Sequence, residues 1–217
     1  MSAELPVDIL FERVVDRGLC TRCGTCAGVC PTGNIHFDDI TGKCLPTRGD
    51  NCNSCGLCLA SCPGERVDFQ PLERGLFAQA DRHHFLGAVR SAFLAHALDH
   101  KVRGEGASGG VATALQLYLL REGRISGSVL YSPSADQPWR GEGIIAETEQ
   151  QIRNSAQSRY HLSPMNTALS ELAEKDGRYA MVALPCQVHG LMKALGAGWK
   201  CRAEIKPVIG IYCGNNL

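Results

Sequence analysis

The chain has 217 residues, enough for one large or two small domains with a sizeable buried core. Lysine plus arginine and aspartate plus glutamate each number 22, so the formal net charge is zero, which argues against a nucleic-acid-binding protein. The charged N-terminal segment and the lack of an apolar run of about 18 residues argue against a signal peptide and a membrane span. We therefore expect a cytoplasmic protein, and its 12 cysteines are the feature to explain.

A short helix is predicted over residues 8–16, directly before the first group of closely spaced cysteines. The cysteines of this group, spaced C-x2-C-x2-C-x3-C and followed by proline, are Cys20, Cys23, Cys26 and Cys30. The same spacing, again followed by proline, recurs in a second group made of Cys52, Cys55, Cys58 and Cys62. This internal repeat is the pattern by which bacterial ferredoxins bind two [4Fe-4S] clusters.

The ligands of the two clusters are expected to be crossed, because in two-cluster ferredoxins the fourth cysteine of each group binds the other cluster. One predicted ligand set is Cys20, Cys23, Cys26 and Cys62. The other predicted set is Cys52, Cys55, Cys58 and Cys30. Zinc is the alternative, but a zinc site needs two cysteine pairs rather than two groups of four that each end in proline. Cys44 fits neither group, and we expect it to be a packed small residue.

The residues around the two groups predict a small module that ends near residue 76. Strands are expected over 34–37 and 43–46, on either side of a turn at 38–42. The alternating residues 66–69 predict a further edge strand. The first predicted domain is therefore a ferredoxin-like module over 1–76.

The second predicted domain, 77–217, begins with a helix that apolar spacing indicates over 85–100. A glycine-rich segment at 103–110 then leads into a helix over 111–120, with Ser108 as the expected N-cap. Bare backbone amides at such a helix start bind anions, and missing side chains let a phosphate or a ring approach the backbone.

The remaining elements alternate between strands and helices. Strands are predicted over 125–131, 179–184 and 205–212, with a loop through Trp139 after the first. Helices are predicted to begin at Thr148 and at Ser163, the latter ending at Gly177, and a last helix is predicted over 187–195. Strands separated by helices indicate an α/β layer structure.

Four segments in order resemble the coenzyme F420 hydrogenase/dehydrogenase beta-subunit family. These segments are ALDHKVRGEGASGGVATALQLYLL at 97–120, QSRY at 157–160 with Ser163, LPCQ at 184–187 and GIYC at 210–213. The paired cysteine groups also suit this family, many of whose members carry a ferredoxin module ahead of the flavin domain. The resemblance implies an α/β FAD-binding domain after the two-cluster module. Family members usually continue well beyond the position of Cys213, so the second domain looks incomplete at its C-terminus.

The resemblance also implies a set of residues in contact with FAD. These residues are Ser108, Gly109, Gly110, Thr113, Ser158, Arg159, Tyr160, Pro185, Cys186 and Gln187. Arg159 is the expected partner of a phosphate or of the negative charge on the reduced ring, because a guanidinium donates two parallel hydrogen bonds. Among the histidines, His161 alone is a candidate for ligand contact.

Three further cysteines lie in the second domain. Cys186, Cys201 and Cys213 are expected to be buried small residues, because three thiolates do not complete a four-iron cluster. Cys186 is the exception of interest, since a helix N-terminus at this point is expected to lower the pKa of its thiol.

The implied function is that of an iron–sulfur flavoprotein oxidoreductase, working in a hetero-oligomer with other redox subunits or ferredoxin. Bound FAD would exchange a hydride with a small-molecule carrier, most of all coenzyme F420, and single electrons with the clusters. No catalytic side chain is assigned, because the cofactors carry the redox chemistry. The alternatives are a ferredoxin-dependent reductase of another organic substrate, as in pigment-reducing relatives, and a pure electron-relay subunit.

Overall fold

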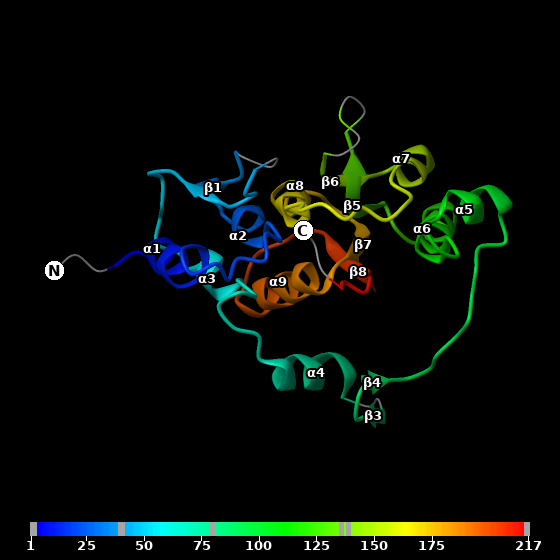
Figure 1. Ribbon diagram of the computed structural model, residues 1–217, viewed down its shortest axis with the longest axis horizontal. Coiled ribbons are helices and arrows are strands. Elements are labelled where there is room, and N and C mark those ends of the chain that lie inside the picture. The colour runs from blue at the N-terminus through cyan, green and yellow to red at the C-terminus, as the bar shows by residue number, and fades with distance from the viewer. Residues whose placement is uncertain (1–3, 39–41, 79–80, 135–136, 138–139, 215–217) are drawn as a thin grey trace.

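The computed structural model describes residues 4–38, 42–78, 81–134, 137 and 140–214. The centre of the predicted turn (39–41), Trp139 and the last residues, 215–217, lie outside this range. Figure 1 shows a cysteine-rich N-terminal module, a helix-covered sheet, and an arm that leaves the first and returns to the second.

The N-terminal module repeats one backbone path around its two cysteine groups. The predicted first helix is present as α1 (Pro6–Leu10), continued by the π-helical segment η1 (Phe11–Val15). Each cysteine group contains a single helical turn, α2 (Thr25–Gly28) in the first and α3 (Leu57–Ala60) in the second. A left-handed glycine precedes each turn, with φ of 85° before α2 and 78° before α3. Glycine adopts this conformation without steric cost, so the sequence repeat is also a structural repeat.

Two strand predictions in this module fare differently. The hairpin is present, with β1 (Ile35–His36) antiparallel to β2 (Thr47–Arg48), although its second strand begins later than expected. The strand predicted over 66–69 is wrong, because Phe69 begins the helix α4 (Phe69–Phe77). Pro71 lies in the first turn of α4, where proline is tolerated because the first amides of a helix have no partner within it.

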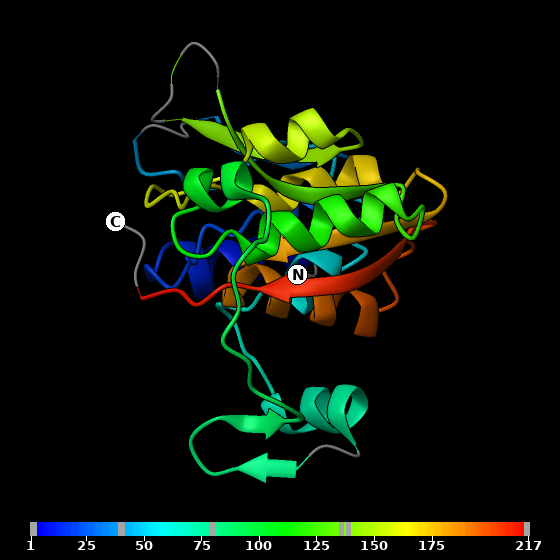
Figure 2. The same cartoon turned by 90° about the vertical axis from the view of Figure 1, so that its right-hand side faces the viewer.

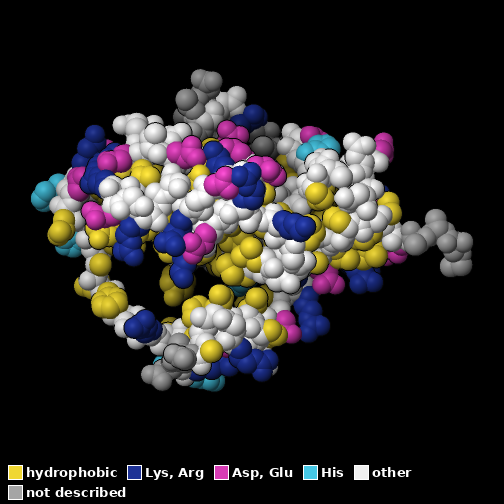
Figure 3. All heavy atoms as spheres, turned by 180° about the vertical axis from the view of Figure 1, so that it is seen from behind, with side chains coloured by type: hydrophobic (Ala, Val, Ile, Leu, Met, Phe, Trp, Pro, Cys, Tyr) yellow, Lys and Arg dark blue, Asp and Glu magenta, His cyan; other side chains and the backbone are white. Residues whose placement is uncertain are grey.

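The arm consists of α4 and the hairpin of β3 (Asp81–His83) and β4 (Gly87–Val89). Figure 2 shows it standing away from the sheet, and Figure 3 shows apolar side chains gathered on it. The predicted domain boundary at residue 76 lies inside α4. No residue of α4 is buried, so the arm adds little to the core.

The helix predicted over 85–100 is wrong. This segment holds β4 and extended chain, and a helix begins only at α5 (His100–Glu105), where Asp99 accepts hydrogen bonds from two backbone amides. Phe85 and Phe93 are 84% and 87% exposed, so no core covers the apolar side that helical spacing would create. Apolar spacing stabilises a helix chiefly when that side is buried against other elements.

The central sheet has four strands in the order β6 (Gly141–Ala146), β5 (Gly127–Pro133), β7 (Arg178–Ala183) and β8 (Glu204–Gly210). The pair β5 and β6 is antiparallel, and the other two pairs are parallel. The three predicted strands are thus present. Strand β6 was not predicted, because glycines interrupt its apolar pattern. One of them, Gly143, has no room for a side chain, since a Cβ would overlap the carbonyl oxygen of Met165.

Helices cover both faces of the sheet, as the α/β prediction requires. Helices α6 (Val111–Arg121) and α7 (Glu149–Asn154) pack on the face of Leu130 and Val182. The face of Val129 and Met181 is covered by η2 (Met165–Ala168), α8 (Leu169–Leu172) and α9 (Pro185–Gly196). Helix α7 begins after a Thr148 capping box, whereas the helix predicted from Ser163 to Gly177 is shortened to η2 and α8. In the described ranges, no helix is long and apolar enough to cross a bilayer.

The cysteine-rich module packs directly on the face that carries α8 and α9. Val29 belongs to the same buried cluster as Leu169 and Leu191. Two glycines permit this approach: a Cβ at Gly28 would overlap the carbonyl oxygen of Asn166, and a Cβ at Gly190 would overlap Thr25 Oγ1. The two parts therefore meet through a tightly fitted interface, which reaches the start of the arm, where the Phe69 ring meets His189 of α9 edge to face.

Candidate functional site

The eight motif cysteines lie in the N-terminal module, five of them in or against its buried cluster, and none of the eight forms a disulfide. The electrostatic influence of these thiols crosses between the two groups, as the crossed assignment requires, although Cys58 also acts on Cys26 of the other predicted set. The thiols that raise the pKa of Cys62 by their charge are Cys23 and Cys20, both from the first group. The thiols whose charge raises the pKa of Cys58 are Cys30, Cys55 and Cys52. Cys30, which comes from the first group, therefore influences a cysteine of the second group.

Burial is the main cause of these shifts and raises the pKa of Cys58 and of Cys62 to about 11. The pKa of Cys26 is raised well above its ordinary value by burial and by four neighbouring thiols. Several buried thiols whose charges repel one another are costly as thiolates unless a cation lies between them. This donor set fits an iron–sulfur cluster, which binds cysteine as thiolate.

The spacing of these cysteines differs from that of a site for one ion. Within the described residues, no three His, Cys, Asp or Glu side chains converge closely enough to hold a single metal ion. A zinc site would bring its thiolates to about 2.3 Å from one ion, whereas a four-iron cluster holds them apart around a cube. Two groups of four cysteines match the ligand requirement of two such clusters, whereas a zinc site needs two cysteine pairs.

A cavity of about 440 Å³ lies at the carboxyl ends of β5 and β7, beside the start of α6. In open α/β sheets this end of the strands is the usual ligand site. The lining residues that the sequence analysis named are Ser108, Gly109, Gly110, Thr113, Ser158, Arg159, Tyr160 and Gln187. His161 lines it too, whereas Pro185 and Cys186 are not among its lining residues.

The glycine-rich loop differs in detail from its prediction. Helix α6 begins after Gly110, with φ of 70°, so the N-cap is Gly110 and not Ser108. A Cβ at Gly110 would lie 2.6 Å from the carbonyl oxygen of Val102, and one at Gly109 would lie 3.0 Å from that of Ala95. Gly110 is therefore required by the fold of the loop itself, whatever ligand the cavity holds, whereas a side chain at Gly109 would be tight but would need only a small shift.

Two polar groups that line the cavity have no partner within the chain. The hydroxyl oxygen of Ser163 and the amide oxygen Oε1 of Gln116 are buried without a hydrogen bond. Buried polar atoms are nearly always paired, so these two atoms indicate a polar ligand. Together with the open amides at the start of α6, they fit a phosphate-containing cofactor such as FAD. Gln116 was not named from the sequence, although it lies one turn after Thr113 on α6.

A tyrosine and a histidine face one another in the cavity wall. The Tyr131 hydroxyl and His161 Nε2 form a hydrogen bond, and their rings meet edge to face. Burial raises the pKa of Tyr131 to about 12. Burial and the nearby Arg159 guanidinium lower the pKa of His161, which keeps its imidazole neutral as an acceptor for the tyrosine. Tyr131 was missed because a tyrosine in a strand gives no signal in the sequence.

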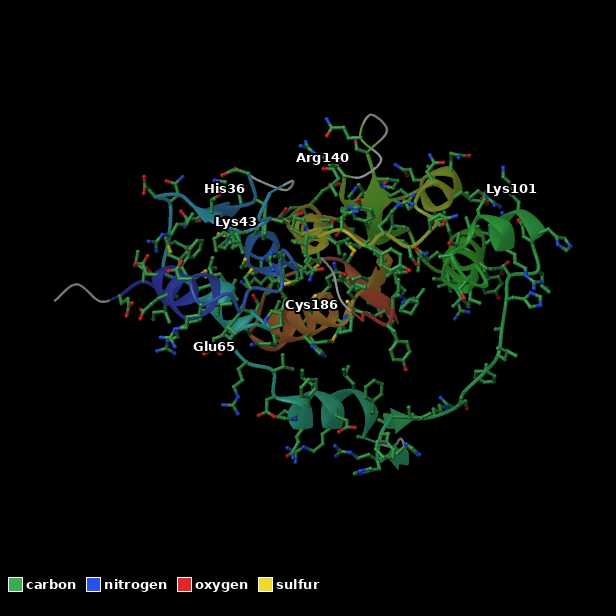
Figure 4. All side chains as sticks on the ribbon, viewed as in Figure 1. His36, Lys43, Glu65, Lys101, Arg140 and Cys186 are labelled. Atoms are coloured by element: carbon green, nitrogen blue, oxygen red, sulfur yellow. The ribbon has the colours of Figure 1, made fainter. Side chains whose placement is uncertain are left out.

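Cys186 is not among the residues that line the cavity, and it lies at the start of α9 (Figure 4). It follows the first residue of α9, and the charged groups that influence its thiol include Cys23 of the module. Burial raises the pKa of its thiol to about 11, with smaller contributions from Cys23 and Cys213, so the expected lowering by the helix start is wrong. Cys201 lies elsewhere and donates to the carbonyl of Leu172. Cys213, expected to be buried, is exposed at the cavity.

One short segment belongs to both the cavity and the first cysteine group. Ser163 and Met165 line the cavity, and the backbone amide of Asn166 donates to the carbonyl of Cys23 at 3.0 Å. Gln187, also in the lining, accepts a hydrogen bond through its carbonyl from Asn166 Nδ2 at 2.9 Å. The cavity and the first cysteine group are therefore separated by a single layer of chain.

Family models match the chain in four consecutive segments. The model described as "Coenzyme F420 hydrogenase/dehydrogenase, beta subunit N-term" matches residues 92–170, and the model for the C-terminal part of the same beta subunit matches 176–217. Two models of 4Fe-4S binding domains match 13–36 and 49–70. Each cysteine group thus falls within one 4Fe-4S match.

Individual relatives agree with these matches. The chain is 31% identical to the coenzyme F420-dependent sulfite reductase of Methanocaldococcus jannaschii, over 94% of this chain and 32% of that protein. It is 31% identical to the coenzyme F420 hydrogenase subunit beta of Methanothermobacter thermautotrophicus, over 61% of this chain and 48% of that protein. The chain therefore spans a third to a half of the length of these relatives.

A solved structure, that of the F420-reducing [NiFe] hydrogenase complex from Methanosarcina barkeri, aligns with a TM-score of 0.47. It is 26% identical over 54% of this chain and 42% of that chain. The family assignment rests on the segment matches, which cover both cysteine groups and both parts of the second domain. The chain belongs to the coenzyme F420 hydrogenase/dehydrogenase beta-subunit family and carries N-terminal 4Fe-4S ferredoxin domains.

Proposed function

We propose that this chain is the electron-transferring part of an F420-linked oxidoreductase and works as a subunit of a larger redox complex. It would bind FAD in the cavity and two [4Fe-4S] clusters in the N-terminal module. The first cluster would have the ligands Cys20, Cys23, Cys26 and Cys62. The second cluster would have the ligands Cys52, Cys55, Cys58 and Cys30. The crossed pattern of thiol influence supports these two sets.

The observation that carries the proposal is the shared segment between cavity and cluster module. Asn166 bonds to Cys23 through its amide, and its neighbour Met165 lines the cavity. A flavin, when bound, converts between the two-electron chemistry of a hydride carrier and the one-electron chemistry of clusters. Such a conversion needs the flavin site and a cluster site to be near neighbours, and the single layer of chain between the cavity and the first cysteine group supports this arrangement.

The cavity residues have distinct tasks in this proposal. The backbone amides before α6 and the unpartnered atoms of Ser163 and Gln116 hold polar groups of the cofactor. Arg159, from the loop after α7, supplies positive charge at the cavity. Tyr131 and the neutral His161 form a hydrogen-bonded polar pair in the wall of the cavity. The cavity stays open to a small carrier, because Arg159 and Tyr160 are both exposed.

The two clusters would lie in series between the outside and the cavity. Cys23, a ligand of the first cluster, contacts the segment at the cavity wall. Cys55, a ligand of the second cluster, is exposed, whereas Cys23 and Cys26 are buried. A partner subunit or ferredoxin would therefore exchange electrons with the second cluster, and the cavity would exchange them with the first.

The test is anaerobic reconstitution of the full chain with iron, sulfide and FAD, followed by addition of reduced F420. We expect about eight iron atoms and one flavin per chain, and bleaching of flavin and cluster absorbance by reduced F420. Bleaching by dithionite or reduced ferredoxin alone would assign the chain to reductases of another organic substrate. Clusters without bound flavin would identify an electron-relay subunit.

Replacement of Arg159 by lysine is expected to weaken FAD binding about tenfold, or roughly 1.4 kcal/mol. Lysine keeps the charge but loses the two parallel hydrogen bonds of a guanidinium. Binding is measured by fluorescence titration of the cluster-loaded chain with FAD. Arg202→Lys is the matched control, because Arg202 pairs with Asp176 away from the cavity. Equal affinities of the two variants would remove Arg159 from the FAD site.

A further inference from the structure

The residue directly before the third cysteine of the first group is a threonine with unusual surroundings. Thr25 is fully buried, and its Oγ1 lies 3.2 Å from the sulfur of Cys23. Asn166, also fully buried, donates to Thr25 Oγ1 from Nδ2 at 2.8 Å. Thr25 is therefore held between a cysteine sulfur and a side chain of the second domain.

The orientation of the Asn166 amide follows from its other partner. Nδ2 faces the carbonyl oxygen of Gln187 at 2.9 Å, and a carbonyl can only accept a hydrogen bond. The atom that faces Gln187 must therefore be the amide nitrogen, which has a second proton for Thr25 Oγ1. The Asn166 oxygen is left buried and without a partner. Exchanging the amide oxygen and nitrogen would improve neither the contact with Gln187 nor the contact with Thr25.

This orientation determines where the threonine proton goes. A hydroxyl has one proton to donate and lone pairs that accept. Because Asn166 occupies a lone pair of Oγ1 as a donor, the contact with Asn166 does not use the Thr25 proton. That proton is directed at Cys23 Sγ, the other polar atom near Oγ1.

The second cysteine group offers an internal comparison. Leu57 stands where Thr25 stands in the first group, two residues after the second cysteine and directly after a left-handed glycine. Leucine has no hydroxyl, so the second group cannot form this hydrogen bond. The two halves of the repeat share one backbone but differ in the group that faces the ligand sulfur.

We propose that Thr25 raises the reduction potential of the first cluster by a hydrogen bond to the sulfur of Cys23, and that Asn166 orients this bond. The inference rests on the proposed function. A hydrogen bond to a ligand sulfur stabilises the more negative, reduced state of a cluster and so raises its potential. Thr25 and Asn166 are positioning residues that act through Cys23. The second predicted ligand set has polar contacts of its own, since the Asn34 amide donates to Cys30 Sγ at 3.3 Å and the Thr32 hydroxyl lies 3.6 Å from it, so the effect of Thr25 is expected on the first cluster alone.

The experiment is a redox titration of the cluster-loaded full chain, followed by paramagnetic resonance. In Thr25→Val, which exchanges the hydroxyl for a methyl group, we expect the ratio of reduced to oxidised first cluster to fall about tenfold at fixed potential. This ratio corresponds to a 59 mV lower midpoint for a one-electron step. Thr25→Ser keeps the hydroxyl and should titrate like the unchanged protein. Asn166→Ala should lower the midpoint in the same direction as Thr25→Val.

A matched control uses another buried hydroxyl near the clusters. Ser61 bonds to the carbonyl of Cys58 and not to a sulfur, so Ser61→Ala should leave the first-cluster midpoint unchanged. If the Thr25→Val variant fails to bind the first cluster, the smaller Thr25→Ala variant replaces it. We expect the same lower midpoint of the first cluster in that variant. Equal midpoints in the Thr25 variants and the unchanged protein would overturn the inference. Absence of clusters from the unchanged protein would instead overturn the proposed function.

Discussion

Replacing Cys62 by serine should remove the first cluster, although Cys62 belongs to the second cysteine group. The charge of the Cys62 thiol raises the pKa of Cys26, and the charges of Cys23 and Cys20 raise the pKa of Cys62. Serine is a poor ligand for iron in place of a thiolate, so we expect iron content to fall by about four atoms per chain. Iron analysis and paramagnetic resonance after reduction measure the loss.

Three further variants decide which cluster is lost. The resonance spectrum of Cys62→Ser should match that of Cys20→Ser, because both remove ligands of the first cluster. The spectrum of Cys30→Ser should match that of Cys52→Ser for the second cluster. A match of Cys62→Ser with Cys52→Ser instead would mean that each group binds its own cluster, and the crossed assignment would be wrong.

Replacing Gly190 by alanine should destabilise the protein by about 2 kcal/mol, despite the better helix propensity of alanine. A Cβ at this position of α9 would overlap Thr25 Oγ1, and Thr25 is buried and bonded to Asn166. Neither side of the contact can move without breaking a hydrogen bond. We expect the unfolding temperature of the cluster-loaded chain to fall by about 4–8 °C, measured by calorimetry or circular dichroism.

Gly196→Ala provides the control from the same helix. A Cβ at Gly196 would meet nothing within 4 Å, so alanine should leave stability unchanged or raise it by up to about 1 kcal/mol. Similar unfolding temperatures for Gly190→Ala and Gly196→Ala would show that the interface between the cysteine-rich module and α9 is looser than the structure describes.

The sequence predicts best where a short segment determines its own structure. The two cysteine groups and the capping box at Thr148 depend on residues close together in the chain, and both are present as expected. The apolar residues at 85–100 were misinterpreted because helical spacing alone says nothing about whether a core will cover them. Strand β6 was missed because its glycines are there for close contacts with distant parts of the chain, as Gly143 is with the backbone of Met165.

The residues that line the cavity show the same limit of sequence-based prediction. The resemblance named eight of the cavity's lining residues, because those residues lie in motifs that can be recognised in the sequence. Gln116 and Tyr131 were not named, since only the fold brings them to the loop at 157–163. Cys186 was assigned to the cavity from its neighbours in the chain. The helix geometry of α9 instead turns it toward the cluster module, which no local pattern could indicate.

The interface between the two parts also bears on the order of folding. Thr25 and Asn166 are 141 residues apart in the chain, and Lys193, which donates to the carbonyl of Cys62, is 131 residues from it. Loop closure over such separations costs little more than over half the length, but contacts this distant form late in folding. During synthesis the cysteine-rich module emerges first. Its inner face, with Val29 and Thr25, then stays uncovered until α9 has been made.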